Sequence, residues 1–300
     1  MAPSLQPRRS VLYLPGSNDR AMNRATVLPA DVVIFDLEDA VAPDAKIESR
    51  ARVCSAISSG GYAPRETVVR VNGMETPWHA DDMAAAVQSG ADAVLVPKVE
   101  TGAQVCALVR TMHEHDAPDG IDLWAMIETP TAFLAVHEIA GADARLTSLV
   151  VGTNDLVNDM HATHVAGRHP IAPVLTLAVV AARAAGKSIF DGVYNAIGDS
   201  SGFAAEARQG REMGFDGKTV IHPSQIEPAN AAFSPSPDEV AHAHKVVSTY
   251  EQACAAGDGV IVVDGRMIES LHVRDAQRLL ALDALIAARD STRPTSPEVS

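Results

Sequence analysis

Two short apolar segments of this sequence each end on a carboxylate. The first is Leu123–Glu128 and the second is Leu149–Asp155. A buried strand seldom ends on an unpaired acid, because an uncompensated carboxylate in a dry site is energetically costly. Two acids at the same end of neighbouring strands would form an oxygen-rich site suited to Mg²⁺, with Mn²⁺ as the alternative ion. We therefore expect Glu128 and Asp155 to be metal ligands.

Ionisable side chains also close most of the other apolar segments. In chain order these residues are Asp36, Glu38, Asp39, Arg70, Lys98, Glu128, Asp155, Asp191 and His222. Some have structural alternatives, since Asp39 could begin a helix and Lys98 could pair with Glu38. His222 is expected to be a packed or hydrogen-bonded residue rather than a general base. Their concentration at strand ends nevertheless predicts an active site.

The residue types indicate the chemistry. A 2-oxo acid or 2-hydroxy acid could chelate Mg²⁺ through its carboxylate and adjacent oxygen, and the metal would polarise that oxygen. Arg70, held near the acids of the second segment, is a fixed cation suited to an enolate or thioester oxygen as charge develops. The sequence has no Cys/His ligand set for zinc. Lys98 lies among acids, which favours ion pairing over a Schiff-base role.

The segments that must position these residues alternate in type. Short runs rich in Val, Ile and Leu are typical of strands buried on both faces of a parallel sheet. We predict such strands at 10–16, 32–38, 67–72, 93–99, 123–129, 146–153, 188–193 and 217–222. Segments with helical periodicity lie between them at 19–29, 45–59, 77–89, 101–115, 131–140, 172–186 and 200–213. This alternation predicts a (β/α)₈ TIM barrel. A doubly wound open sheet is the alternative, although no GxGxxG turn follows the first strand.

The composition changes after the eighth strand, at the Pro/Ser-rich turn 233–238. We assign residues 1–232 to a catalytic barrel domain and residues 233–290 to a C-terminal helical lid, with helices at about 238–256 and 267–288. Residues 291–300 are expected to be a disordered tail. The lid is too short for an independent core, so it should pack on the barrel or on a neighbouring subunit.

Composition restricts the partners. The formal net charge of −14 argues against binding to nucleic acid or to an anionic membrane. Cys54, Cys106 and Cys254 are an odd number without CxxC spacing and are expected to be buried, reduced thiols. No signal peptide or membrane-spanning run is visible, so we expect a cytoplasmic protein.

The strand-end residues also resemble a known family, the citrate lyase β-subunit-like and malyl-CoA lyase-like enzymes. The resemblance covers about residues 8 to 285 and is specific because seven motifs occur in order. They are Arg9–Gly16 (RSVLYLPG), Asp36–Val41 (DLEDAV), Val69–Asn72 (VRVN), Pro97–Lys98, Glu128–Thr129, Gly152–Leu156 (GTNDL) and Gly217–Pro223 (GKTVIHP).

This resemblance implies a TIM barrel that binds Mg²⁺ and breaks or forms a carbon–carbon bond next to a CoA thioester. It implies that Glu128 and Asp155 bind the metal and that Arg70 stabilises the enolate. Glu38, Asp39 and Lys98 would form a supporting network, with Asp39 a candidate for proton transfer. Arg20 and Arg24 would lie near the CoA phosphates, and Val193 would line the pantetheine or substrate pocket. The family also implies a homotrimer or hexamer, whose C-terminal segment reaches a neighbour's active site.

The sequence departs from the family pattern at two places. Pro130–Phe133 follows Glu128-Thr129 where the family often has a glycine, which should change the pocket shape more than metal binding. The lid has Met267-Ile-Glu269, whereas lyases of the family usually carry Met-Ile-Asp, with the Asp as acid/base. Glu269 moves that carboxylate one methylene further out, and a displacement of about 1 Å can cost roughly 100-fold in rate.

The leading hypothesis from the sequence is a Mg²⁺-dependent lyase. It would cleave malyl-CoA or citramalyl-CoA to acetyl-CoA and a 2-oxo acid, with Asp39 or Glu269 moving the hydroxyl proton. A thioesterase that hydrolyses malyl-CoA on the same scaffold is the second hypothesis, kept because of Glu269. A carrier-dependent subunit of a citrate lyase complex and an aldolase for substrates without CoA are further alternatives.

Overall fold

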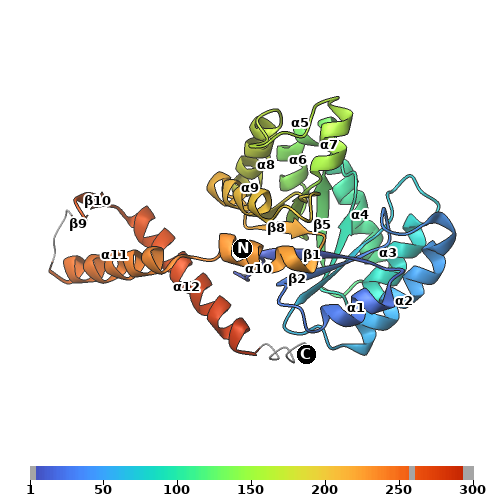
Figure 1. Ribbon diagram of the computed structural model, residues 1–300, viewed down its shortest axis with the longest axis horizontal. Coiled ribbons are helices and arrows are strands. Elements are labelled where there is room, and N and C mark those ends of the chain that lie inside the picture. Colours follow the sequence, from blue (N-terminus) through green and yellow to red (C-terminus); the bar gives the residue numbers. More distant parts are fainter. Residues whose placement is uncertain (1–4, 257–260, 293–300) are drawn as a thin grey trace. The chain divides into compact units, whose positions relative to one another are not determined.

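The computed structural model describes residues 5–256 and 261–292, and its main feature is a closed barrel of parallel strands (Figure 1). Each strand pairs with its neighbours in sequence, and β1 pairs with β8 to close the barrel. The strands are β1 Ser10–Pro15, β2 Val32–Asp36, β3 Glu66–Arg70, β4 Ala93–Val96, β5 Asp122–Ile127, β6 Leu146–Val151, β7 Ser188–Asp191 and β8 Gly217–Val220. The (β/α)₈ prediction is confirmed, and the open sheet is wrong because no barrel strand is left with a free edge.

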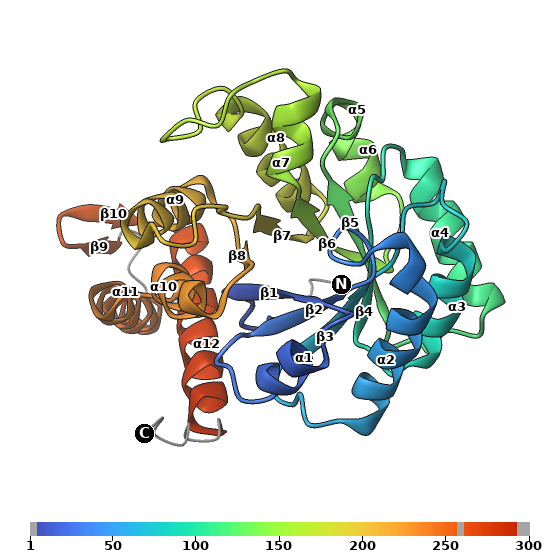
Figure 2. The same ribbon diagram turned by 45° about the vertical axis from the view of Figure 1, so that its right-hand side comes forward.

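Helices surround the strands, as Figure 2 shows. They are α1 Asp19–Ala25, α2 Lys46–Ser59, α3 His79–Gln88, α4 Gly102–Glu114, α5 Pro130–Leu134, α6 Val136–Gly141, α7 Thr153–Asp159, α8 Ala172–Ala184, α9 Ser200–Met213 and α10 Ile226–Phe233, with short 3₁₀ helices η1 Pro43–Ala45 and η2 Pro223–Gln225. Local signals start several of them. Thr101 and Gln104 form a capping box at α4, and the Asp199 side chain accepts a hydrogen bond from the Gly202 N–H at α9.

The strands have two buried faces. Inside the barrel lies an apolar cluster of Val11, Val32, Ile34, Val68, Ala93, Leu95, Trp124, Met126, Val150 and Phe190, with Tyr13 packed against it. The alternate residues point outward and pack against the helices. This explains why the strand segments are apolar without alternation, and it leaves the polar residues at the carboxyl ends as the open face of the barrel.

The observed strands end earlier than predicted, and two helices were not predicted. For example, β2 ends at Asp36 and β6 at Val151, because the inter-strand pairing stops there. The residues that follow form turns and helix starts. Asp155 therefore lies in the first turn of the unpredicted helix α7 rather than on a strand. Helix α10 is the second addition.

The described chain divides into two compact units, Arg8–Phe233 and a second unit of residues 5–7 and 234–292 outside the gap at 257–260. The second unit contains α11 Pro237–Ala256, a hairpin of β9 Ile261–Val263 and β10 Arg266–Ile268, and α12 Ser270–Thr292. Its own small core includes Ala243, Val246, Ile261, Val263 and Val273. The predicted tail at 291–300 lies mostly outside the described residues.

The helix predicted at about 267–288 is observed as α12, but it begins later than predicted, at Ser270, because residues 266–268 form strand β10. Asp264 and Gly265 make the hairpin turn, with φ values of 50° and 76°. An Asp-Gly pair with positive φ at both positions is the preferred two-residue turn between antiparallel strands. Glu269 therefore stands between a strand and the start of α12.

The cysteine prediction is partly wrong. All three thiols are free, but Cys54 is half-buried and both Cys106 and Cys254 are exposed on helices α4 and α11. The Cys54 thiol lies against the Ala85 carbonyl of α3, and the Cys106 thiol lies against the Ala142 carbonyl. Among the described helices, none combines the length and the apolar character needed to cross a membrane.

Candidate active site

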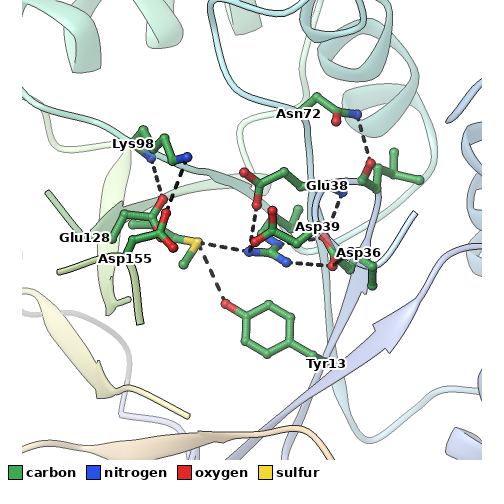
Figure 3. A network of polar contacts seen from close by, with 12 residues as sticks. Tyr13, Asp36, Glu38, Asp39, Asn72, Lys98, Glu128 and Asp155 are labelled. Atoms are coloured by element: carbon green, nitrogen blue, oxygen red, sulfur yellow. Dashed lines mark hydrogen bonds and ion pairs between the residues drawn. The ribbon is translucent and has the colours of Figure 1, made fainter. Parts of the chain in front are cut away.

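The predicted site residues gather at the carboxyl end of the barrel. A cavity of about 350 Å³ opens there, and its walls include Tyr13, Asp36, Asp39, Arg70, Glu128 and Asp155. Figure 3 shows the acids and Lys98 around this space. A larger hollow of about 540 Å³ lies next to it and shares Thr153, Val193 and Asn195 with it. The larger hollow contains neither Glu128 nor Asp155, so we place the chemistry in the smaller one.

Arg70 is held rigidly by the end of β2. Its Nε and Nη2 donate to the two oxygens of Asp36 at 2.7 and 2.6 Å, and Nη1 lies 2.7 Å from Glu38 and 3.5 Å from Asp39. Asp36 also accepts backbone hydrogen bonds from Glu38 and Ala40. Burial lowers the pKa of Arg70, but Asp36, Tyr13 and Glu38 together outweigh burial, and the pKa lies well above its usual value. A bidentate pair of this kind gives a cation with a fixed direction.

Glu128 and Asp155 meet at the opposite side of the cavity. Glu128 is only 4% exposed, and its Oε1 accepts a hydrogen bond from the Lys98 backbone N–H at 2.9 Å. Asp155 is more open, and its carboxylate lies 3.4 Å from the Lys98 ammonium. Lys98 therefore pairs with Asp155, and the pairing with Glu38 considered from sequence is not the contact observed.

The acids of the site outnumber the cations. The site contains two cations, Arg70 and Lys98. It contains five carboxylates, which belong to Asp36, Glu38, Asp39, Glu128 and Asp155. Burial, followed by repulsion from Glu38 and Asp155, raises the pKa of Glu128 to about 8. Burial also raises the pKa of Glu38 to about 7, although Arg70 opposes it. Buried carboxylates that resist ionisation in this way are stabilised by an added cation.

The donor set fits a hard divalent cation. Glu128 and Asp155 offer carboxylate oxygens, which Mg²⁺ and Mn²⁺ both accept. Within residues 5–256 and 261–292 no group of three or more His, Cys, Asp or Glu side chains is arranged to hold a metal. Two protein ligands would leave most positions of an octahedral ion for water and substrate, which suits a catalytic rather than a structural metal.

Two strand-end residues lie away from the cavity. Asp191 is fully buried outside the barrel wall, where it binds Arg168 at 2.6 Å and Lys218 at 3.1 Å. Burial raises its pKa, but the two cations outweigh burial and the net shift is downward. His222 is exposed, and its Nδ1 accepts a hydrogen bond from the Ser224 N–H. The hydrogen bond of His222 agrees with the expectation for that residue, whereas Asp191, grouped from the sequence with the active-site acids, does not line the cavity.

The alternation of β7 explains the position of Asp191. Phe190 points into the barrel, so the next residue must point outward, toward the helices. The same rule would have found Tyr13, which sequence reasoning missed. Tyr13 lies on β1 two residues from the inward-facing Val11, and its ring stacks on the Arg70 guanidinium at 4.8 Å. Asp36, which the sequence placed among the strand-end acids without a role of its own, is the anchor of Arg70.

The remaining candidates are spread over two regions. Arg20 and Arg24 are exposed on α1, directly after β1, and Val193 lines the cavity after β7. Glu269 belongs to the second unit, where it is exposed and its N–H donates to His272 Nδ1 at 2.9 Å.

The fold and the site together define a (β/α)₈-barrel protein with a carboxylate-rich, arginine-containing site at the carboxyl ends of its strands. The chain belongs to the HpcH/HpaI aldolase/citrate lyase family, whose model matches residues 9–223.

Several relatives cover nearly the whole chain. A (3S)-malyl-CoA thioesterase of Cereibacter sphaeroides is 47% identical over 288 residues, which are 96% of this chain and 99% of the relative. The citrate lyase subunit beta of Escherichia coli is 34% identical over 94% of this chain and 95% of the relative. The solved structure of protein CitE from Mycobacterium tuberculosis in complex with magnesium, acetoacetate and coenzyme A is 30% identical. It has a TM-score of 0.73 and covers 94% of this chain and 99% of that chain.

Proposed function

We propose that this protein is a Mg²⁺-dependent thioesterase that hydrolyses malyl-CoA to malate and CoA. The observation that carries the proposal is the cavity in which Arg70 faces the Glu128–Asp155 pair. Full-length similarity to a (3S)-malyl-CoA thioesterase supports hydrolysis as the outcome. This places hydrolysis ahead of carbon–carbon cleavage, the reverse of the order that the sequence alone suggested.

Glu128 and Asp155 would hold the metal, and the magnesium-containing CitE structure supports Mg²⁺ as the ion. When bound, Mg²⁺ would supply a Lewis acid that neutralises and orients the free carboxylate end of the substrate. Lys98 contacts both proposed metal ligands, because its backbone N–H donates to Glu128 and its ammonium lies beside Asp155.

Arg70 and Asp39 would act on the thioester end. Water adds to the thioester carbon, the carbonyl oxygen becomes negative, and Arg70 stabilises that charge. Asp39 lines the cavity, is 72% exposed on its side chain and lies 3.5 Å from Arg70, so it can accept the proton of the attacking water. The carbonyl then re-forms as the carbon–sulfur bond breaks, and the CoA sulfur takes the proton that Asp39 accepted from water and leaves as the thiol.

CoA recognition is assigned to the residues beside the cavity. Arg20 and Arg24 offer exposed positive charge on α1 for the CoA phosphates, and Val193 forms part of the cavity wall. We expect Arg24→Ala to weaken binding of a CoA ester while malate binding in the presence of Mg²⁺ stays unchanged.

The direct test is to incubate the purified protein with malyl-CoA and Mg²⁺ and to measure both product pairs. We expect malate and free CoA, loss of turnover with EDTA, and recovery with added Mg²⁺ or Mn²⁺. Turnover of a free CoA ester by the lone protein would also separate it from a carrier-dependent citrate lyase subunit. Stoichiometric glyoxylate and acetyl-CoA would contradict hydrolysis and support the second candidate, and the absence of both product pairs would reject both.

The second candidate is retro-Claisen cleavage of the same substrate, favoured by the fixed cation at Arg70 that an enolate also requires. The acid at position 269 is the proposed determinant of the route. We expect Glu269→Asp to increase the ratio of glyoxylate to malate, because the shorter side chain restores the lid residue that lyases of the family carry. Glu269→Gln serves as the control without a carboxylate. A product ratio unchanged in Glu269→Asp would remove this residue from the mechanism.

A further inference from the structure

Two hydrogen-bond donors in the cavity converge on one weak acceptor. Arg70 Nη1 lies 3.7 Å from the Met126 sulfur, and the Tyr13 hydroxyl lies 3.8 Å from the same atom. Figure 3 shows the Tyr13 ring with its hydroxyl directed at this sulfur. Arg70 Nη1 carries two N–H groups, of which one is taken by Glu38 at 2.7 Å. A thioether is a poor acceptor, so neither the other N–H nor the Tyr13 O–H is used to its full strength by the contact with Met126. An oxygen atom that entered beside the sulfur would receive both hydrogen bonds.

Both donors are fixed before any substrate arrives. Tyr13 belongs to β1, where it pairs with Ile34 of β2, and its ring rests on the Arg70 guanidinium at 4.8 Å. Arg70 is in turn held by both oxygens of Asp36. Burial raises the pKa of the Tyr13 phenol, so it keeps its proton as a donor at neutral pH. Donors that need no reorganisation are those that stabilise developing charge most effectively.

We propose that Tyr13 and Arg70 together form an oxyanion hole, in which the Tyr13 O–H donates the second hydrogen bond to the substrate's thioester oxygen. This inference rests on the proposed function, but it does not depend on which product forms. In hydrolysis the carbon–oxygen π electrons move to that oxygen as the water oxygen bonds to carbon. In cleavage the electrons of the breaking carbon–carbon bond reach the same oxygen as an enolate. Tyr13 keeps its proton in both routes.

The arrangement around Met126 supports a role for the hydroxyl beyond packing. Tyr13 packs on the apolar cluster inside the barrel, carries a hydroxyl and lines the cavity. Its neighbours Val11 and Ile34 are apolar and fully buried. A tyrosine that only filled space would be replaceable by phenylalanine without loss. The two interpretations therefore differ in a single atom, the Tyr13 oxygen.

The kinetic experiment compares Tyr13→Phe with wild type on malyl-CoA and Mg²⁺. We expect kcat to fall about 100-fold, as for the loss of one oxyanion-hole donor, with KM changed less than threefold. Tyr62→Phe is the matched control, because Tyr62 is also buried but donates to the Met22 carbonyl outside the barrel interior. Met126→Leu should keep most activity, because it removes the sulfur and leaves both donors. Equal kcat in Tyr13→Phe and wild type would overturn the proposal.

A binding experiment separates this inference from the proposed reaction. Carboxymethyl-CoA carries a carboxylate whose oxygens lie one bond further from the sulfur than the thioester oxygen. It therefore presents a negatively charged oxygen to the two donors, and it can be titrated by calorimetry without turnover. We expect Tyr13→Phe to bind it at least 10-fold more weakly than wild type and Tyr62→Phe to bind it equally well. Equal affinity in Tyr13→Phe would reject the oxyanion hole even if malyl-CoA is hydrolysed. A wild-type protein that binds the analogue through Tyr13 but turns over no malyl-CoA would reject only the proposed reaction.

A crystal of the wild-type protein with carboxymethyl-CoA tests the geometry without any variant. We expect one carboxylate oxygen within about 3 Å of both the Tyr13 hydroxyl and Arg70 Nη1. A carboxylate bound with Tyr13 still facing the Met126 sulfur alone would overturn the proposal.

Discussion

Glu128, the proposed metal ligand, is a buried carboxyl group through which metal binding would affect the stability of the folded protein. It is almost fully enclosed, receives one backbone hydrogen bond and faces two other acids. Its ionised form is therefore costly until a cation arrives. Glu38 shares this property in part, since Arg70 lies 2.7 Å away but burial still dominates its pKa.

The stability of the metal-free protein should decrease as pH rises from about 5 to 8. The pKa values of Glu38 and Glu128 rise from 4.5 to about 7 and about 8, so in this window the folded state binds more protons than the unfolded state. Linkage then makes the free energy of unfolding fall with increasing pH. Mg²⁺ affinity should rise over the same window, because the ion displaces those protons.

Thermal unfolding in EDTA, with and without added Mg²⁺, measures this effect. Glu128→Gln cannot ionise, so its melting temperature should fall less between pH 5 and 8 than that of wild type. A wild-type melting temperature that rises in EDTA across this window, relative to Glu128→Gln, would contradict the assignment.

At the scale of elements, the close contact of the β5 and β6 ends fixes the position of Glu128, the proposed metal ligand. Gly152 follows β6, and a Cβ placed there would lie 2.4 Å from the Glu128 Oε2 atom and 2.5 Å from its Cβ. Only glycine allows this approach. Packing against Glu128 therefore requires the glycine at position 152. The same motif supplies Asp155, three residues later in α7.

Gly152→Ala should displace the Glu128 carboxylate and weaken Mg²⁺ binding by about 10-fold or more. The added methyl group should also destabilise the fold by about 1–3 kcal/mol, a typical cost of overpacking. Calorimetric titration with Mg²⁺ and thermal unfolding measure the two effects. Gly120→Ala is the matched control, because nothing lies within 4 Å of its added Cβ. Unchanged Mg²⁺ affinity in Gly152→Ala would show that Glu128 does not bind the ion.

At the scale of the whole molecule, the second unit has its own small core and carries Glu269 in an exposed position. The family resemblance led us to expect a homotrimer or hexamer in which this segment completes a neighbouring site. We propose that the second unit of one subunit completes the site of a neighbouring subunit, which a test of shared sites can distinguish from association alone.

Two inactive variants should complement each other if sites are shared between subunits. Arg70→Ala lacks the barrel cation and Glu269→Gln lacks the lid carboxylate, so a mixed oligomer would contain some sites with both groups intact. We expect the mixture, after subunit exchange, to recover up to about a quarter of wild-type activity on malyl-CoA, provided that Glu269→Gln alone is impaired. Gel filtration checks the oligomer. No recovery from exchanged subunits would place Glu269 in its own subunit's site or outside the site altogether.

The sequence alone determined the barrel and most of the polar residues at its open end, although it included Asp191 and missed Tyr13. Both follow from the local order of residues along the chain. This order shows the short apolar runs, the helical periodicity and the residue that follows each strand. The direction in which each residue points was decided only by barrel closure. Closure turned Asp191 outward to Lys218 and Tyr13 inward to Arg70, and it brought Lys98 to Asp155 rather than Glu38. Side-chain direction has a period of two along a strand, and partners on other strands are set by register, so neither follows from the type of residue.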